Sequence, residues 1–338
     1  MLDYRAAPDT LAPAVAPVAK AVALVESGIF DCYLVVERDG VCTVAGGTRA
    51  VVALDGDQLR VRCHGSESHR SWLVRPLVRL GETLTELPVS GCTAYGWVAF
   101  ELAYLLAGRR DLAGNGTLAQ LIVPRAEVWI GPQGTVIDCV NPVLRERIEL
   151  VLDAVLSVPE PRPVETAMVW RGEAYSRAVA DAVWEINRSS LKKVTLSASV
   201  VVENKVDLPR TYLAGRPDSS FLVDMGGLRA MGSCPRTEPH DSWAEFESGF
   251  PAVAASGIPR AAACDYIARS ERGRRGLYGG AIIRAGWDGS VEARTVLGVL
   301  TGGRELRAGA GVDAKSTGCA QVRERLREVA PYHVTTVS

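Results

Sequence analysis

The feature that constrains the fold most is a series of alternating apolar and polar stretches joined by tight turns. Four such segments occur, at residues 30–47, 48–63, 126–140 and 276–300. Three of them turn at an Asp-Gly pair, namely Asp39-Gly40, Asp55-Gly56 and Asp288-Gly289. These residues tolerate the positive φ angles that two-residue hairpin turns require. The chain is therefore expected to build sheets from hairpin-linked strands.

Helical periodicity appears between these hairpins. Apolar residues recur at spacings of three and four in five segments, at residues 67–87, 144–157, 173–189, 258–271 and 318–331. Residues 304–311 are expected to form a last strand that ends in a glycine-rich turn, Ala308 to Gly311. Helices mixed with hairpin-linked strands predict the α+β class, with β-sheets flanked by helices. The proline-rich residues 159–163 predict a linker, so we expect one domain over 1–338 with halves at 1–158 and 165–338.

Composition excludes several classes of partner. The chain has 338 residues, of which 47% are hydrophobic, and its formal net charge is -1. No run of basic residues is present, which argues against nucleic acid as a partner. No uninterrupted apolar stretch is long enough to cross a bilayer. The eight cysteines are scattered without a C-x-x-C pair, so we expect reduced thiols in a cytoplasmic protein.

Seven short segments, taken in order, resemble the chorismate-utilising enzymes, and most of all the salicylate synthases of siderophore biosynthesis. These segments are DCYLVVERDG, YGWVAFELA, KKVTLSASV, SFLVDMGGLRAMG, FPAVAASGIPRAAA, RRGLYGGAII and LRAGAG. They span nearly the whole chain. The resemblance implies the fold of anthranilate synthase component I. It does not by itself imply the activity, because a site depends on its own residues.

The resemblance implies the following chemistry for the family. A lysine activates water on one face of the chorismate ring, and a glutamate on the opposite face protonates the departing hydroxyl. A magnesium ion held by glutamates of two helices binds the ring carboxylate. The family lysine corresponds here to Lys193. Its neighbour Lys192 would point to the opposite face of the same strand. Tyr278, Gly309 and Gly311 also match family positions that line the pocket.

The acid and metal positions depart from the family pattern. The family's general acid corresponds to Arg236, which cannot donate a proton at neutral pH; Glu238 stands two residues further on. The first metal-binding helix is missing, because only eleven residues separate Glu238 from Phe250. On the last helix the two metal glutamates correspond to Gln321 and Glu324. This chain is thus expected to use no metal and no cofactor.

Two substrate-binding positions have also lost polarity. A family arginine that binds a carboxylate corresponds to Leu297, and a threonine corresponds to Ala254. These replacements suit a pocket for a larger and less charged ligand than chorismate. The expected site is ringed by Lys193, Arg236, Ala254, Tyr278, Leu297 and the Gly309–Gly311 segment.

Structural explanations compete with these functional ones. Lys193 would also suit a solvated strand, and Arg236 a surface loop. Tyr278 would also suit a core in which its hydroxyl finds a backbone partner. Glu324 fits a solvated helix face, and the two glycines could serve only the turn.

Three functions remain open from the sequence. The first is a repurposed, metal-independent enzyme of a natural-product pathway, such as a pericyclic cyclase, lyase or isomerase, since pericyclic steps need shape more than acids. The second is a non-catalytic binding or scaffold protein. The third is an active salicylate or isochorismate synthase, which is the function that the residues support least. We expect a small-molecule substrate, and a homodimer if the deleted segment leaves a sheet edge exposed.

Overall fold

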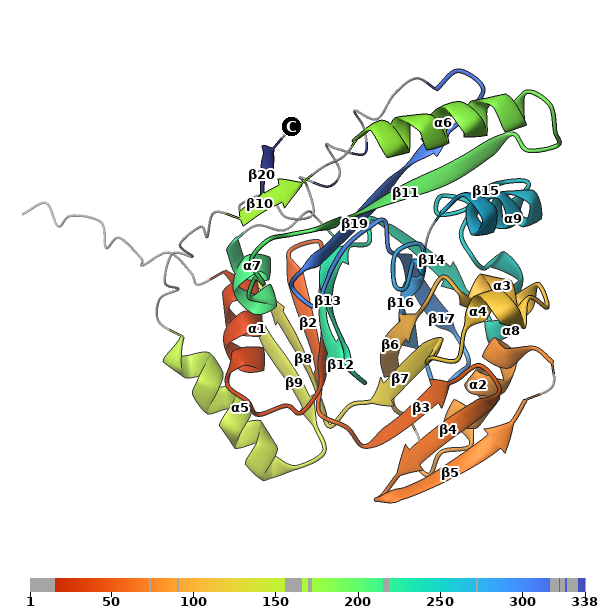
Figure 1. Ribbon diagram of the computed structural model, residues 1–338. Coiled ribbons are helices and arrows are strands. Elements are labelled where there is room, and N and C mark those ends of the chain that lie inside the picture. The colour runs from red at the N-terminus through yellow and green to blue at the C-terminus, as the bar shows by residue number, and fades with distance from the viewer. Residues whose placement is uncertain are drawn as a thin grey trace, which may run out of the picture.

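The computed structural model consists of two large antiparallel sheets that face each other, with helices on their outer faces (Figure 1). It describes residues 16–338 except 73, 90, 156–165, 170–171, 215–218, 272, 317–321, 323–325, 327–333 and 338. Figure 1 shows the sheets meeting in a layered arrangement, which agrees with the α+β class predicted from the sequence.

The first sheet has ten strands, and the strand that carries Lys193 lies near one edge. In spatial order it contains β15 (Gly257–Ile258), β11 (Lys193–Val201), β19 (Glu305–Val312), β18 (Gly298–Thr301), β13 (Leu228–Ser233), β12 (Ser220–Met225), β1 (Tyr33–Arg38), β2 (Val41–Gly46), β8 (Ala126–Gly131) and β9 (Gly134–Cys139). Both halves of the chain contribute strands, and β1 joins them by pairing with β12. The halves named from the sequence therefore share one sheet.

The second sheet has eight strands, and β14 lies at its edge. Its order is β14 (Arg236–His240), β17 (Val291–Thr295), β16 (Ala281–Ala285), β6 (Ala94–Val98), β7 (Ala119–Val123), β3 (Ala50–Leu54), β4 (Gln58–Cys63) and β5 (Ser66–Ser71). Here too the halves meet, because β16 pairs with β6. A separate short pair is formed by β10 (Thr166–Val169) and β20 (Val334–Val337), which run parallel.

Helices cover the outer faces. The described helices are α1 (Pro17–Glu26), α2 (Pro76–Thr85), α3 (Leu102–Leu106), α4 (Arg110–Ala113), α5 (Pro142–Ala154), α6 (Gly172–Ile186), α7 (Leu208–Ala214), α8 (Trp243–Gly249) and α9 (Arg260–Ser270). Helix α1 contacts β2 and β8 of the first sheet, while α2 and α8 contact the second. A distinct apolar cluster that includes Phe221, Trp97 and Tyr278 contains residues of both sheets, so Tyr278 belongs to the core between them.

Of the three Asp-Gly pairs, only Asp39-Gly40 forms the predicted two-residue turn; Asp55-Gly56 and Asp288-Gly289 lie in the longer loops 55–57 and 286–290. Asp39 and Gly40 have φ angles of 51° and 75° between β1 and β2, as a type I′ turn requires. Gly289 has a φ of 88° between β16 and β17. The hairpins at residues 30–47, 48–63, 126–140 and 276–300 are thus confirmed, because each contains a paired antiparallel couple of strands.

Two expectations about local structure were wrong, and a third falls on residues that the structure does not describe. Residues 67–71 form the exposed strand β5 instead of the start of a helix, and only Pro76–Thr85 is helical. Ala308 to Gly311 are not a turn but lie inside β19, paired with β11. Gln321 and Glu324 lie outside the described residues.

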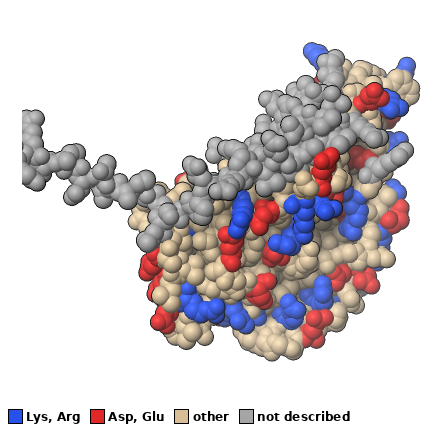
Figure 2. All heavy atoms as spheres, turned by 60° about the vertical axis from the view of Figure 1, so that its left-hand side comes forward, with Lys and Arg blue, Asp and Glu red and all other residues tan. Residues whose placement is uncertain are grey.

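The surface carries no concentration of one charge on the face that Figure 2 shows. Basic and acidic side chains are interspersed over its described part (Figure 2), in keeping with 38 basic and 39 acidic residues in the chain. None of the described helices is both long and apolar enough to span a membrane.

Candidate functional site

Strand β11 positions Lys193 against the neighbouring strand. Lys193 is half-buried while Lys192 is exposed, as alternation along a strand requires. A Cβ atom placed on Gly311 would lie 2.6 Å from Cε of Lys193. The lysine side chain therefore lies along bare backbone of β19, in space that only a glycine leaves open. This places Lys193 beside Gly311, as the expected site requires.

Tyr278 lies on the same face of β19 as Lys193, because Gly309 and Gly311 are two residues apart on one strand. Its side chain is fully buried, at 0% exposure, and its hydroxyl group lies where a Cβ atom on Gly309 would be. Gly309 and Gly311 have no positive φ, since they sit in regular strand. Both positions thus require glycine because of close approach by a side chain, and not because of backbone conformation.

A buried ion pair fixes β11 to its surroundings. Arg275 is 4% exposed, and its Nε donates to Oε2 of Glu271 at 2.8 Å. Its Nη2 donates to the carbonyl of Thr195 at 2.7 Å and its Nη1 to that of Ala255 at 2.9 Å. Burial alone would lower the pKa of Arg275, but the Glu271 carboxylate holds that pKa above its ordinary value. The guanidinium therefore stays charged and joins three segments.

Glu271 also accepts a backbone hydrogen bond from β11, as a neighbouring strand would. Its carboxylate accepts from the backbone N–H of Ser197 at 2.6 Å and from the Ser197 hydroxyl at 2.8 Å. Arg307 of β19 donates to the same hydroxyl at 3.2 Å. The sequence reasoning did not single out Arg275 or Glu271. The RRG sequence before Leu277 could have indicated a buried ion pair, because charged residues next to a buried segment must be paired.

The remaining predicted residues fall into two places. Ala254 is half-buried, and its carbonyl accepts from the Thr195 hydroxyl at 3.0 Å, which links it to the Lys193 strand. Leu297 is half-buried just after β17, and its N–H donates to the carbonyl of Ser233 at 3.1 Å. Arg236 is exposed on the edge strand β14, opposite Thr295.

The described contacts thus group the expected residues unevenly. Lys193, Gly311 and, through Thr195, Ala254 lie around β11, and Tyr278 lies against Gly309 on the same face of β19. No hydrogen bond or ion pair among the described residues connects Arg236 or Leu297 to Lys193. Their place in one pocket stays a prediction.

A wide groove adjoins β11. It has a volume of about 1010 Å³ and lies between α6, β11 and α9. Ser197, Glu271 and Arg307 line it, so it reaches the polar network described above. Tyr175 of α6 also lines the groove, and its buried hydroxyl donates to the carbonyl of Leu196 at 3.1 Å. Burial raises the pKa of Tyr175 well above its ordinary value, so the hydroxyl remains a donor at neutral pH.

The described residues do not form a set of ligands that fits the magnesium ion of the family. They contain no group of three or more His, Cys, Asp or Glu side chains that could hold a metal. Only Asp241 and Ser242 separate β14 from α8, which leaves no room there for the metal helix that the resemblance implies for the family. Magnesium prefers several carboxylate oxygens, and Gln321 offers none.

Comparison with known proteins agrees with this fold. Residues 233–330 match the family model described as chorismate binding enzyme. The salicylate synthase of Mycolicibacterium paratuberculosis is 28% identical over 403 aligned positions, which cover 89% of each chain. Because 403 positions exceed the 338 residues of this chain, the relative has residues for which this chain has none.

One further relative is similar in sequence, and two solved structures are similar in fold. Anthranilate synthase component 1 of Streptomyces coelicolor is 31% identical over 47% of this chain and 29% of its own length. The crystal structure of anthranilate synthase component I from Streptococcus pneumoniae superposes with a TM-score of 0.61 at 13% identity, covering 86% of this chain and 91% of its own. The menaquinone-specific isochorismate synthase of Escherichia coli gives 0.56 at 13% identity, covering 91% and 89%. The chain is thus similar to chorismate-utilising enzymes, and it matches a salicylate synthase over 89% of its length.

Proposed function

We propose that this protein is a metal-independent enzyme derived from a salicylate synthase-like ancestor, and that it rearranges or cleaves a small molecule less charged than chorismate. The observation that carries the proposal is Lys193, which lies half-buried along Gly311. A lysine held on bare backbone is oriented in a way that a solvated surface lysine is not. The loss of polarity at Leu297 and Ala254 supports a substrate with fewer charges.

In this proposal Lys193 is the group that touches the substrate. Its ammonium group can hold an oxygen of the substrate, or its amine can remove a proton. Tyr278 acts as a positioning residue on the same face of β19, because its hydroxyl lies against Gly309 and its ring is fully buried. The Arg275–Glu271 pair keeps β11 in register. The proposed cyclase, lyase or isomerase step is pericyclic. Such a step depends more on a pocket that holds the substrate in the reactive shape than on an acid or a metal.

The test is substrate consumption without free metal. Purified protein in excess EDTA is incubated with fractionated small-molecule extract from the source cells, and consumption is followed by mass spectrometry. Lys193→Met keeps the length of the side chain, and the exposed Lys192→Met is the matched control. Wild type and Lys192→Met should consume the same compound, and Lys193→Met should be at least about tenfold slower. The proposal fails if the compound is consumed only with magnesium, or equally by all three proteins.

A scaffold protein is the second candidate, and the complete burial of Tyr278 favours it, because a hydroxyl enclosed in the core serves packing. The same experiment separates the two. A scaffold protein would consume no compound, although Lys193→Met would fold normally. Under this alternative the wide groove beside β11 would be a binding surface.

A further inference from the structure

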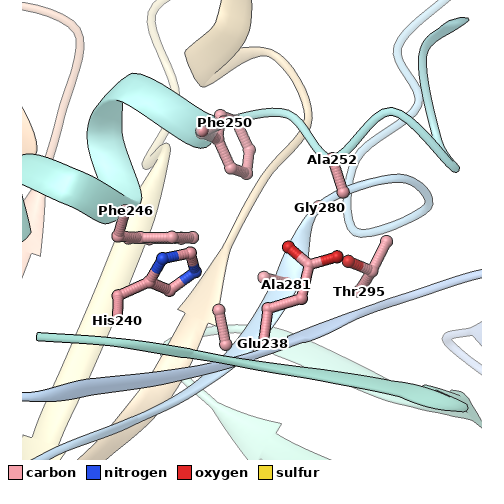
Figure 3. A pocket seen from close by; sticks show the side chains of 10 residues that line it. Glu238, His240, Phe246, Phe250, Ala252, Gly280, Ala281 and Thr295 are labelled. Carbon is pink, nitrogen blue, oxygen red and sulfur yellow. The ribbon is translucent and has the colours of Figure 1, made fainter.

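Edge strand β14 points three alternate side chains toward helix α8. Arg236, Glu238 and His240 occupy one face of the strand, and Glu238 and His240 border a small hollow of about 10 Å³, which has room for one water-sized group. The remaining lining residues come from α8, the segment after it, and strands β16 and β17: Phe246, Gly249, Phe250, Ala252, Gly280, Ala281, Ala293 and Thr295. Figure 3 shows the Glu238 carboxylate close to Thr295, with the His240 ring beneath Phe246.

Polar groups without partners converge on this hollow. Nε2 of His240 is buried and has no hydrogen-bond partner among the described residues. In the same part of the chain, no hydrogen bond or ion pair involves the Glu238 carboxylate or the Thr295 hydroxyl. Buried polar groups in folded proteins are almost always paired. A histidine nitrogen that is aimed into a hollow and has no partner therefore indicates something that binds there.

The three groups share a chemical property, because each can accept a hydrogen bond. The carboxylate only accepts, a hydroxyl can accept, and a neutral imidazole with its proton on Nδ1 accepts at Nε2. A primary ammonium group has three donors and no acceptor, so it matches this set one to one. Phe246 and Phe250 also line the hollow, and aromatic faces attract cations.

We propose that this hollow binds the head of a small primary aliphatic amine. An anion would be repelled by Glu238. The site is small, and the exposed side of Glu238 leaves room for the amine's chain to extend into solvent. Lys193 does not line this hollow, and the proposal stands or falls independently of the proposed enzymatic function.

The test is a titration of the wild-type protein with methylammonium chloride at constant pH and ionic strength. The imidazole signals of the histidines are followed by NMR, and the His240 signal is assigned with His240→Gln. Tetramethylammonium chloride serves as the matched salt, because it carries the same charge and no N–H donor. Methylammonium should move the His240 signal saturably, and tetramethylammonium should not.

Variants then test the acceptors. Glu238→Gln should weaken methylammonium binding at least tenfold, while Glu146→Gln, an exposed glutamate on α5, should bind as wild type. Thr295→Val removes one acceptor at constant shape and should weaken binding severalfold; melting temperatures confirm that each variant is folded. Failure of the His240 signal to saturate, an equal effect of tetramethylammonium, or wild-type affinity in Glu238→Gln would each overturn the proposal.

Discussion

At the scale of single residues, Gly309 and Gly311 behave differently although they look alike in the sequence. A side chain at Gly309 would meet the Tyr278 hydroxyl and, at 2.5 Å, the backbone carbonyl of Leu196. At Gly311 it would meet the end of the Lys193 side chain, at 2.6 Å from Cε. The first set of neighbours cannot move, whereas a lysine side chain can.

We therefore expect Gly309→Ala to destabilise the protein by about 1–3 kcal/mol, the usual cost of overpacking. Gly311→Ala should cost less, and should instead displace Lys193. Chemical denaturation of both variants measures this difference. Removing the hydroxyl with Tyr278→Phe should recover part of the Gly309→Ala loss. Equal costs for the two glycines would mean that both contacts relax.

Ala254 and Leu297 test whether the expected pocket exists. Both are half-buried, so Ala254→Phe and Leu297→Trp should fill space that a substrate needs. Turnover of the substrate should fall more than the melting temperature, because the added volume obstructs a cavity. Overpacking of a core would instead cost about 1–3 kcal/mol. If both variants unfold readily, these positions are core; if both keep full stability and activity, the site is elsewhere.

At the scale of secondary-structure elements, the Arg275–Glu271 pair holds β11, α9 and the segment at Ala255 together. Removing one member of a buried ion pair leaves the other uncompensated, which typically costs about 3–5 kcal/mol. Arg275→Met should lower the free energy of unfolding by that amount. The exposed Arg269→Met on α9 should change it by less than about 0.5 kcal/mol. Similar small effects in both variants would show that the pair is not structural.

Much of the fold could be predicted from patterns of the sequence, but not all of it. The Asp39-Gly40 and Asp288-Gly289 turns have a local cause, since φ is set by the residues themselves. Strand β5 has no apolar alternation and is exposed throughout, so its pairing with β4 decides its conformation. Strand β14 contains Pro239, which suits only an edge strand; that position depends on the whole sheet.

The site shows the same division. The β-branched neighbours of Lys193 predict that it lies on a strand. The position of Gly311 beside it could not be predicted in this way, because it depends on the pairing of β11 with β19. The Arg275 network and the Glu238–His240 hollow involve residues far apart in the chain. A single sequence does not give such long-range contacts.

At the scale of the whole molecule, the two halves of the chain are interleaved in both sheets, and the segment that the sequence predicts to be shortened lies between β14 and α8. A shortened segment there would leave both sheets intact, because their strand pairings lie outside it. On the first sheet, β15 pairs with β11 only at Lys193 and Val194. The rest of that edge has no strand partner among the described residues, and the expected homodimer stays a prediction.

The absence of a fitting ligand set gives a prediction about magnesium. Only Glu324 remains of the two family glutamates on the last helix, so the protein should bind magnesium no better than a surface carboxylate does. Isothermal calorimetry should show no stoichiometric site in the micromolar range. Such a site, if found, would mean that carboxylates outside the described residues complete a metal centre.

The most direct test of the account is the family reaction itself. Purified protein is incubated with chorismate and magnesium, and salicylate is followed by its fluorescence. The resemblance matches Arg236 to the family's general acid and Leu297 to its carboxylate-binding arginine, so we expect this chain neither to donate that proton nor to neutralise the substrate. The account predicts no protein-dependent salicylate and no isochorismate by chromatography. Salicylate that forms in proportion to the protein, and disappears in Lys193→Met, would contradict it.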